Sequence, residues 1–123
     1  MENAAIAVLV VEDEPLILMN AIDFFEEAGF KVYEARNAAE ALRVLEEQDD
    51  IRVVFTDVDM PGSMNGLALA FAVWDRWPPI QLIVTSGFTR IPQSDLPAGG
   101  VFVPKPYQHN TITQLARQMV SLA

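Results

Sequence analysis

The chain contains no cysteine and only one histidine, His109. The lack of cysteine excludes disulfides and thiolate metal sites, and we expect His109 to cap a helix or face solvent rather than to catalyse. No apolar run approaches the roughly 20 residues that a membrane span needs, and the first residues lack the positive region of a signal peptide. We therefore expect a cytoplasmic protein with no membrane segment.

Basic residues are also scarce. The chain has 8 lysines and arginines against 17 aspartates and glutamates, a formal net charge of −9. Non-specific nucleic-acid binding relies on clustered lysine and arginine to neutralise phosphates, so this charge argues against it. A hydrophobic content of 51% rules out disorder. A length of 123 residues fits a single domain that spans 1–123.

Short apolar runs alternate along the chain with segments of helical periodicity. The runs, which are typical of β-strands, cover residues 6–11, 30–35, 51–56, 80–85 and 101–103. Helices are expected to begin at Pro15 and after the cap-box residue Asn37, and to cover 67–77 and 111–122. The side chains expected in the core include Leu67, Ala70, Phe71, Trp74, Met19 and Met119.

The alternation breaks down over residues 88–100, where Pro92, Pro97, Gly99 and Gly100 leave no helical stripe. We expect any helix in this segment to be short or irregular. Elsewhere, apolar strands that alternate with helices predict an α/β fold, a doubly wound parallel sheet with helices on both faces. A set of five strands favours the flavodoxin-like order 2-1-3-4-5.

Polar residues follow four of the predicted strands at the point where each strand ends. Glu12 and Asp13 follow the first strand, Asp57 the third, Ser86 the fourth and Lys105 the fifth. The carboxyl ends of parallel strands meet at one edge of the sheet, where ligands bind in open α/β folds. Each residue alone has an ordinary explanation, such as an acid at a helix start or a solvated lysine. Their combination predicts a site at this edge.

The residue types in this predicted site indicate phosphoryl chemistry. Three carboxylates packed together repel one another, so they need protons or a cation. Oxygen ligands select a hard cation, and Mg²⁺ fits because it takes a few carboxylates and keeps water that a phosphate can displace. Lys105 and Ser86 could each contact a phosphoryl oxygen. Asp57 beside the metal would be a nucleophile toward phosphorus, which predicts an acyl phosphate.

Four short segments of the chain match the motifs of one family. They are 10–15 (VVEDEP), 56–62 (TDVDMPG), 84–87 (VTSG) and Lys105-Pro106. The chain resembles a response-regulator receiver domain, the phospho-acceptor module of two-component signalling, over essentially its whole length. The resemblance implies that Asp57 is the phosphorylated aspartate.

The resemblance also implies a set of magnesium ligands. Asp13 and Asp57 would bind Mg²⁺ directly, and the backbone carbonyl of Asp59 would be a further ligand. Glu12 would act through a water molecule. The peptide bond before Pro106 would be cis, as is typical of the family.

The switch residues come from the same resemblance. Ser86 would be the switch hydroxyl, Lys105 would contact the phosphoryl group, and Phe102 would be the rotating aromatic side chain. Thr85 is an alternative to Ser86. A small residue follows the switch hydroxyl in the family, and Gly87 in that position favours Ser86.

The implied function is a switch. Asp57 would take a phosphoryl group, with Mg²⁺, from a histidine kinase or a histidine phosphotransfer protein, and the change would alter a surface for an unknown downstream protein. We expect no attached output domain after Ala123, and therefore a stand-alone protein or the receiver of a hybrid kinase, and not an enzyme with other substrates. Two alternatives stay open: a phosphate-independent pseudo-receiver that acts as an interaction module, and a small Mg²⁺-dependent phosphohydrolase with Asp57 as its nucleophile.

Overall fold

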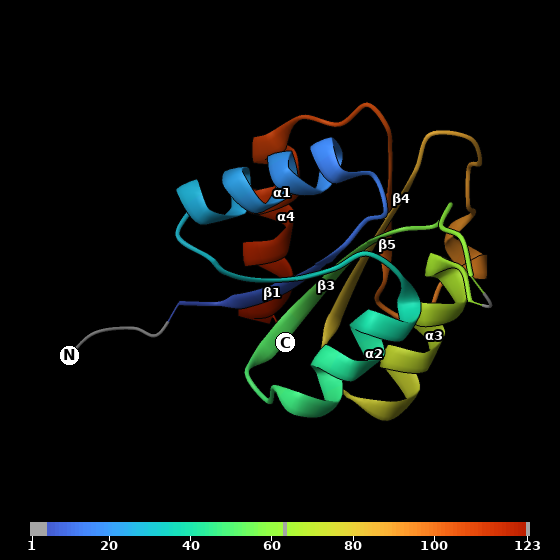
Figure 1. Ribbon diagram of the computed structural model, residues 1–123, viewed down its shortest axis with the longest axis horizontal. Coiled ribbons are helices and arrows are strands. Elements are labelled where there is room, and N and C mark those ends of the chain that lie inside the picture. Colours follow the sequence, from blue (N-terminus) through green and yellow to red (C-terminus); the bar gives the residue numbers. More distant parts are fainter. Residues whose placement is uncertain (1–4, 63, 123) are drawn as a thin grey trace.

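The computed structural model describes residues 5–62 and 64–122, which form a five-stranded parallel sheet between two layers of helices (Figure 1). The strands are β1 Ala7–Val11, β2 Lys31–Ala35, β3 Ile51–Asp57, β4 Gln81–Ser86 and β5 Val101–Pro104. Their order, β2-β1-β3-β4-β5, confirms the order predicted from the sequence. Each predicted strand differs from the observed one by a single residue at one or both ends.

The α-helices of the described residues divide between the two faces of the sheet. They are α1 Pro15–Glu27, α2 Ala38–Glu47, α3 Gly66–Arg76 and α4 His109–Leu122. Helices α1 and α4 cover one face, and α2 and α3 cover the other (Figure 1). The predicted arrangement, with helices on both faces, is therefore confirmed.

Strand β1 shows how one apolar run serves both layers. Successive side chains of a strand point to opposite faces. Val8 and Val10 accordingly pack in the cluster that contains Phe25 of α1, while Leu9 and Val11 pack in the cluster beneath α2 and α3. Every residue of β1 is buried, as expected for a strand covered on both faces.

Helix α3 buries a different face from the one predicted. Its buried residues include Leu69, Ala70 and Val73, whereas Phe71 and Trp74 are 42% and 46% exposed. The prediction was wrong for these two aromatic residues because nearly every position at the start of this helix is apolar, so the helical period singles out no face. The smaller side chains face the sheet, and the two bulky rings lie outside.

Helix α1 carries a second departure from the predicted core. Met19 is 59% exposed, and Leu16 on the same helix is 78% exposed. The buried side of α1 is formed instead by residues such as Leu18 and Phe25. Met119 of α4 is 8% exposed, which confirms its predicted place in the core.

Residues 88–100 contain only a single short helical turn, the 3₁₀ helix η1 Gln93–Asp95. Leu96 anchors the segment to the core, and the Gln93 side chain donates a hydrogen bond to the Gly100 carbonyl at 2.8 Å. The prediction of a short or irregular helix is confirmed. Among the described residues, no helix combines the length and the apolar character needed to cross a bilayer.

Candidate functional site

The carboxyl ends of the central strands bring the predicted site residues to one edge of the sheet. The strand register places Asp57 beside Thr85. The Lys105 backbone N–H donates to the Ser86 carbonyl at 3.0 Å, which holds the end of β5 against β4. Glu12 follows β1, the neighbour of β3 on its other side. The residues expected at this edge therefore lie together.

An acidic cluster forms the floor of the site. Glu12, Asp13 and Asp57 each offer a carboxylate oxygen, and these oxygens lie within 4.8 Å of one another. Glu12 and Asp57 are buried, and Asp13 is half-buried. This set of hard oxygen donors fits a small divalent cation such as Mg²⁺. The backbone carbonyl of Asp59 belongs to the loop that follows β3, two residues after Asp57.

Lys105 supplies the positive charge of the site. Its Nζ lies 3.1 Å from Asp57 Oδ2 and 3.3 Å from Glu12 Oε1. Burial opposes the charged form of the ammonium, but attraction to the two carboxylates outweighs burial, so the pKa of Lys105 is raised. Lys105 therefore stays protonated and holds the two acids in place.

The surroundings of Glu12 disfavour its ionised form. Burial raises the pKa of Glu12 above its usual value, and the charge of Asp57 adds to this effect. The Glu14 N–H, which donates to Oε2 at 3.1 Å, and the Lys105 ammonium act in the opposite direction without reversing it. The cluster thus carries more negative charge than a single lysine compensates, which is the environment that attracts a further cation.

Ser86 and its sequence neighbour Thr85 differ in the hydrogen bonds that their hydroxyl groups make. The Thr85 hydroxyl is buried and has no hydrogen-bond partner among the described residues. The Ser86 hydroxyl donates to Asp59 Oδ2 at 2.6 Å, at the edge that holds Asp57. Because adjacent strand residues point to opposite faces, only one of the two can address the site, and this geometry favours Ser86.

The region after β5 contributes one residue that the sequence analysis missed. The Lys105–Pro106 peptide bond is cis, and Tyr107 follows it with its ring edge-on to Phe55 at a centroid distance of 5.5 Å. Burial is the main cause that raises the pKa of Tyr107, and Lys105 acts against it. The signal that the sequence offered for Tyr107 was an aromatic residue two positions after Lys105. Phe102 on β5 is half-buried against the core cluster beneath α2 and α3.

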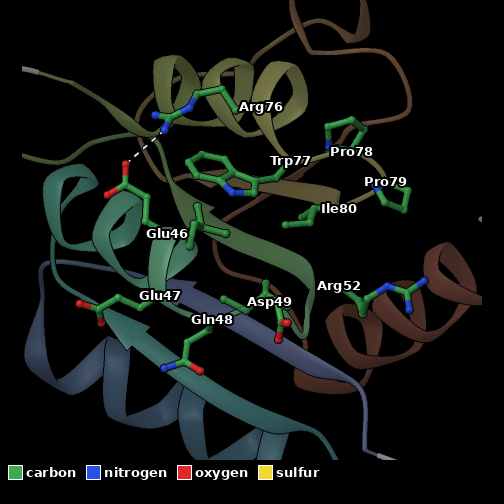
Figure 2. Close-up of a pocket in the computed structure, with 12 residues that line it drawn as sticks. Glu46, Glu47, Gln48, Asp49, Arg52, Arg76, Trp77, Pro78, Pro79 and Ile80 are labelled. Atoms are coloured by element: carbon green, nitrogen blue, oxygen red, sulfur yellow. Dashed lines mark hydrogen bonds and ion pairs between the residues drawn. The ribbon is translucent and has the colours of Figure 1, made fainter.

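A cavity of about 830 Å³ lies at the opposite end of the strands (Figure 2). Its lining includes Trp77, Pro78, Pro79 and the turn before β3. The Arg76 guanidinium carbon lies 4.2 Å from the centroid of the Trp77 ring. The guanidinium also donates to Glu46 Oε2 at 3.2 Å, and a dashed line in Figure 2 marks this contact. None of the predicted site residues lines this cavity, so its size does not locate the chemistry.

Replacing Lys105 with Met is expected to lower the free energy of unfolding of the metal-free protein by about 2 kcal/mol. Methionine preserves an unbranched apolar stem but leaves two buried carboxylates without their cation. Breaking a buried pair usually costs about 3–5 kcal/mol, and the loss is smaller here because the Lys105 side chain is 21% exposed. Chemical denaturation in a chelating buffer measures it.

Lys31→Met is the matched control. Lys31 pairs with Asp50 at 2.9 Å, but the two side chains are 53% and 42% exposed, so solvent screens the pair and its loss should lower the unfolding free energy far less than Lys105→Met does. Added Mg²⁺ should reduce the loss of unfolding free energy in Lys105→Met and leave the loss in Lys31→Met unchanged. Equal losses for the two variants would contradict a buried charge network around Lys105.

Comparisons with known proteins agree with this geometry. A family model described as a response regulator receiver domain matches residues 8–117. The sensor kinase CckA of Brucella abortus (strain 2308) is 30% identical over 122 residues, which make up 96% of this chain and 13% of that protein. The aerobic respiration control protein ArcA of Escherichia coli (strain K12) is 32% identical over 117 residues, 93% of this chain and 48% of that protein. The chain thus spans less than half the length of both relatives.

The likeness extends to solved structures. A response regulator receiver protein from Sinorhizobium medicae WSM419 aligns with a TM-score of 0.88 over 95% of each chain, at 21% sequence identity. That identity is low, so this match speaks for the fold alone. The matched family segment runs from β1 to α4 and includes every strand end that carries a site residue. The chain therefore belongs to the response regulator receiver domain family of two-component signalling.

Proposed function

We propose that this domain is a cytoplasmic phospho-acceptor switch, in which Asp57 takes a phosphoryl group from a phosphohistidine on a histidine kinase or a histidine phosphotransfer protein. One observation carries the proposal: the buried Asp57 carboxylate lies among Glu12, Asp13 and Lys105 at the open edge of the sheet. The net charge of −9 supports protein partners over nucleic acid.

Transfer begins when an Asp57 carboxylate oxygen attacks phosphorus. The O–P bond forms as the P–N bond to the donor imidazole breaks, and the electron pair leaves with the imidazole nitrogen. Lys105, 3.1 Å from Oδ2, neutralises charge on the transferring group. A Mg²⁺ ion held by Asp13, Asp57, the Asp59 carbonyl and, through water, Glu12 would supply further neutralisation of the phosphoryl oxygens.

The phosphoryl group then acts as the signal. It adds negative charge and acceptor oxygens at the edge where Ser86 lies. Ser86 would donate to one of these oxygens, and Phe102 would repack with it, which shifts the population of a surface that a downstream protein recognises. The domain would therefore act through protein contact, and its chemistry would be limited to gaining and losing its own phosphoryl group.

Intact-protein mass spectrometry tests the proposal. Incubation with acetyl phosphate and Mg²⁺ is expected to add one phosphoryl group, and replacement of Mg²⁺ by a chelator should prevent the gain. If neither phosphorylation nor beryllofluoride binding occurred, the domain would be a phosphate-independent interaction module. Sustained turnover of a small phosphate ester would instead indicate a phosphohydrolase.

Helix α1 presents an apolar patch beside the site. Leu16 and Met19 are 78% and 59% exposed, and they lie on one side of the helix because they are three residues apart. Ile17 of the same helix lines a cavity of about 470 Å³ together with Lys105. Exposed apolar side chains rimmed by polar ones are typical of protein docking sites. We therefore assign this face to the protein that donates the phosphoryl group.

Replacing Leu16 with Asp is expected to slow transfer from a protein donor about tenfold, the effect of losing about 1.4 kcal/mol of contact. The rate with acetyl phosphate should stay the same, because the Leu16 side chain is 78% exposed and the acidic cluster is formed by other residues. The initial rate is measured with a phosphotransfer protein from the same genome that phosphorylates the unaltered domain. Phe71→Asp on α3, 42% exposed, is the control and should change neither rate. If Leu16→Asp slowed transfer from the phosphotransfer protein and from acetyl phosphate equally, the substitution would be disturbing the acidic site itself, and the docking assignment would fail.

A further inference from the structure

Asp59 makes a side-chain contact that its proposed metal role does not use. Its Oδ2 accepts a hydrogen bond from the Ser86 hydroxyl at 2.6 Å, a distance typical of a hydroxyl that donates to an ionised carboxylate. Its backbone N–H donates to Asp57 Oδ1 at 3.2 Å. Asp59 therefore connects the phosphoryl acceptor to the hydroxyl on the neighbouring strand.

The Ser86 hydroxyl is fully occupied in this arrangement. A serine hydroxyl has one proton to donate and two lone pairs that accept. The proton goes to Asp59, and the oxygen accepts the backbone N–H groups of Phe88 at 3.1 Å and Thr89 at 3.0 Å. No proton is left for a phosphoryl oxygen on Asp57. The hydroxyl must therefore leave Asp59 before it contacts that group.

We propose that Asp59 is a positioning residue, whose carboxylate holds the Ser86 hydroxyl in the unphosphorylated domain and competes with the phosphoryl group for it. The inference rests on the proposed phosphorylation of Asp57. A phosphoryl group and the Asp59 carboxylate are both anionic, so they repel each other at this short range. Phosphorylation thus weakens the old acceptor and supplies a new one.

The same hydroxyl anchors the start of the segment 88–100. Phe88 is 90% exposed, and the two N–H groups that Ser86 accepts are the first polar anchors of a segment that forms only one 3₁₀ turn. When the hydroxyl turns from Asp59 to the phosphoryl group, these N–H groups must follow it or lose their acceptor. Asp59 therefore couples the charge on Asp57 to the path of residues 88–100.

The first part of the test uses metal-free protein and amide hydrogen exchange measured by NMR. Asp59→Ala is expected to speed exchange of the Phe88 and Thr89 amides about tenfold, because the Ser86 hydroxyl turns freely once its carboxylate partner is gone. In a Ser86→Ala background, Asp59→Ala should add nothing. Unchanged exchange in Asp59→Ala alone would overturn the proposal.

The second part measures the binding of beryllofluoride, a phosphoryl mimic, in the presence of Mg²⁺. Asp59→Asn preserves the side-chain shape but removes the charge that competes for Ser86, so binding is expected to tighten about tenfold. In a Ser86→Ala background the same substitution should tighten binding about twofold or less, because there is no hydroxyl to compete for. Equal tightening in both backgrounds would mean that Asp59 acts only through general repulsion, and the proposal would fail.

Asp75→Asn supplies the charge-matched control. Asp75 is exposed on α3, so its substitution removes the same charge and should change neither measurement. Thermal unfolding of every variant checks that the fold is retained. If the unaltered protein bound no beryllofluoride and gained no phosphoryl group, the proposed phosphorylation would fail, while the exchange measurement would still decide whether Asp59 holds Ser86.

Discussion

The Asp57→Asn variant is expected to gain no phosphoryl group at any concentration of acetyl phosphate or Mg²⁺ that phosphorylates the unaltered domain. An amide nitrogen and oxygen of the same shape replace the carboxylate, but the neutral amide is a far weaker nucleophile toward phosphorus. The expected loss is therefore complete rather than partial. Intact-protein mass after incubation with the donor, compared directly between the two proteins, measures it.

The neighbouring acids are not expected to replace Asp57. The Asp59 carboxylate accepts the Ser86 hydroxyl and is not one of the three clustered acids. Glu12 belongs to the cluster and also contacts Lys105, but it follows β1, whereas Asp57 is the last residue of β3, the middle strand of the sheet. A phosphoryl adduct in Asp57→Asn would contradict this assignment, and peptide mapping would then identify the true acceptor.

The fold of this variant should survive. Burial is the main cause that raises the pKa of Glu12, and like-charge repulsion from Asp57 adds to it, so loss of the Asp57 charge relieves part of the crowding in the cluster. Lys105 retains Glu12 as a partner at 3.3 Å. The Asp57→Asn protein is therefore expected to melt no lower than the unaltered domain, and exposed Asp75→Asn on α3 should retain full phosphorylation. A melting temperature of Asp57→Asn clearly below that of the unaltered domain would show that the substitution damages the fold.

The sheet order and the position of the site residues could be predicted from sequence because they depend only on which segments form strands and on the order of these strands along the chain. A continuous apolar run such as that of β1 indicates a strand buried on both faces. Parallel strands then bring their carboxyl ends to one edge, so Asp57 and Lys105 meet there whatever the loops between them do.

The details that could not be predicted depend on packing in three dimensions. The start of α3 is apolar all round, so its period could not show that Phe71 and Trp74 lie outside. The hydrogen bond between Asp59 and Ser86 joins residues 27 positions apart, and no local pattern reports such a distance. Its existence depends on how the loop after β3 folds back over the sheet edge.

Gly66, the first residue of α3, shows how tightly that loop is folded. Its N–H donates to the Val58 carbonyl at 3.0 Å. A Cβ atom built on Gly66 would overlap the backbone carbonyl oxygen of Asp57 and would lie 2.9 Å from the Thr56 hydroxyl oxygen. The helix therefore begins directly against the backbone of the proposed phosphoryl acceptor, and only glycine allows this approach.

Replacing Gly66 with Ala is expected to lower the free energy of unfolding by about 2–3 kcal/mol, the upper part of the range of about 1–3 kcal/mol that overpacking usually costs. Helix propensity acts in the other direction, because alanine stabilises a helix interior by about 1 kcal/mol relative to glycine. The steric effect is larger, since the obstructing atoms belong to the backbone and cannot rotate away. Chemical denaturation in the presence and absence of Mg²⁺ measures the change.

The same substitution should reach the chemistry, because the atoms that must move belong to Asp57. A displacement of about 1 Å at a reacting group can cost about a hundredfold in rate, so phosphorylation by acetyl phosphate is expected to slow by about that factor. Gly87→Ala is the control for stability: its new Cβ would meet Lys105 at 3.7 Å, an ordinary contact, and the unfolding free energy should change by less than about 1 kcal/mol. If Gly66→Ala were as stable as the unaltered domain, or more stable, helix propensity would outweigh the contact. The close approach of α3 to Asp57 would then not be a constraint on the site.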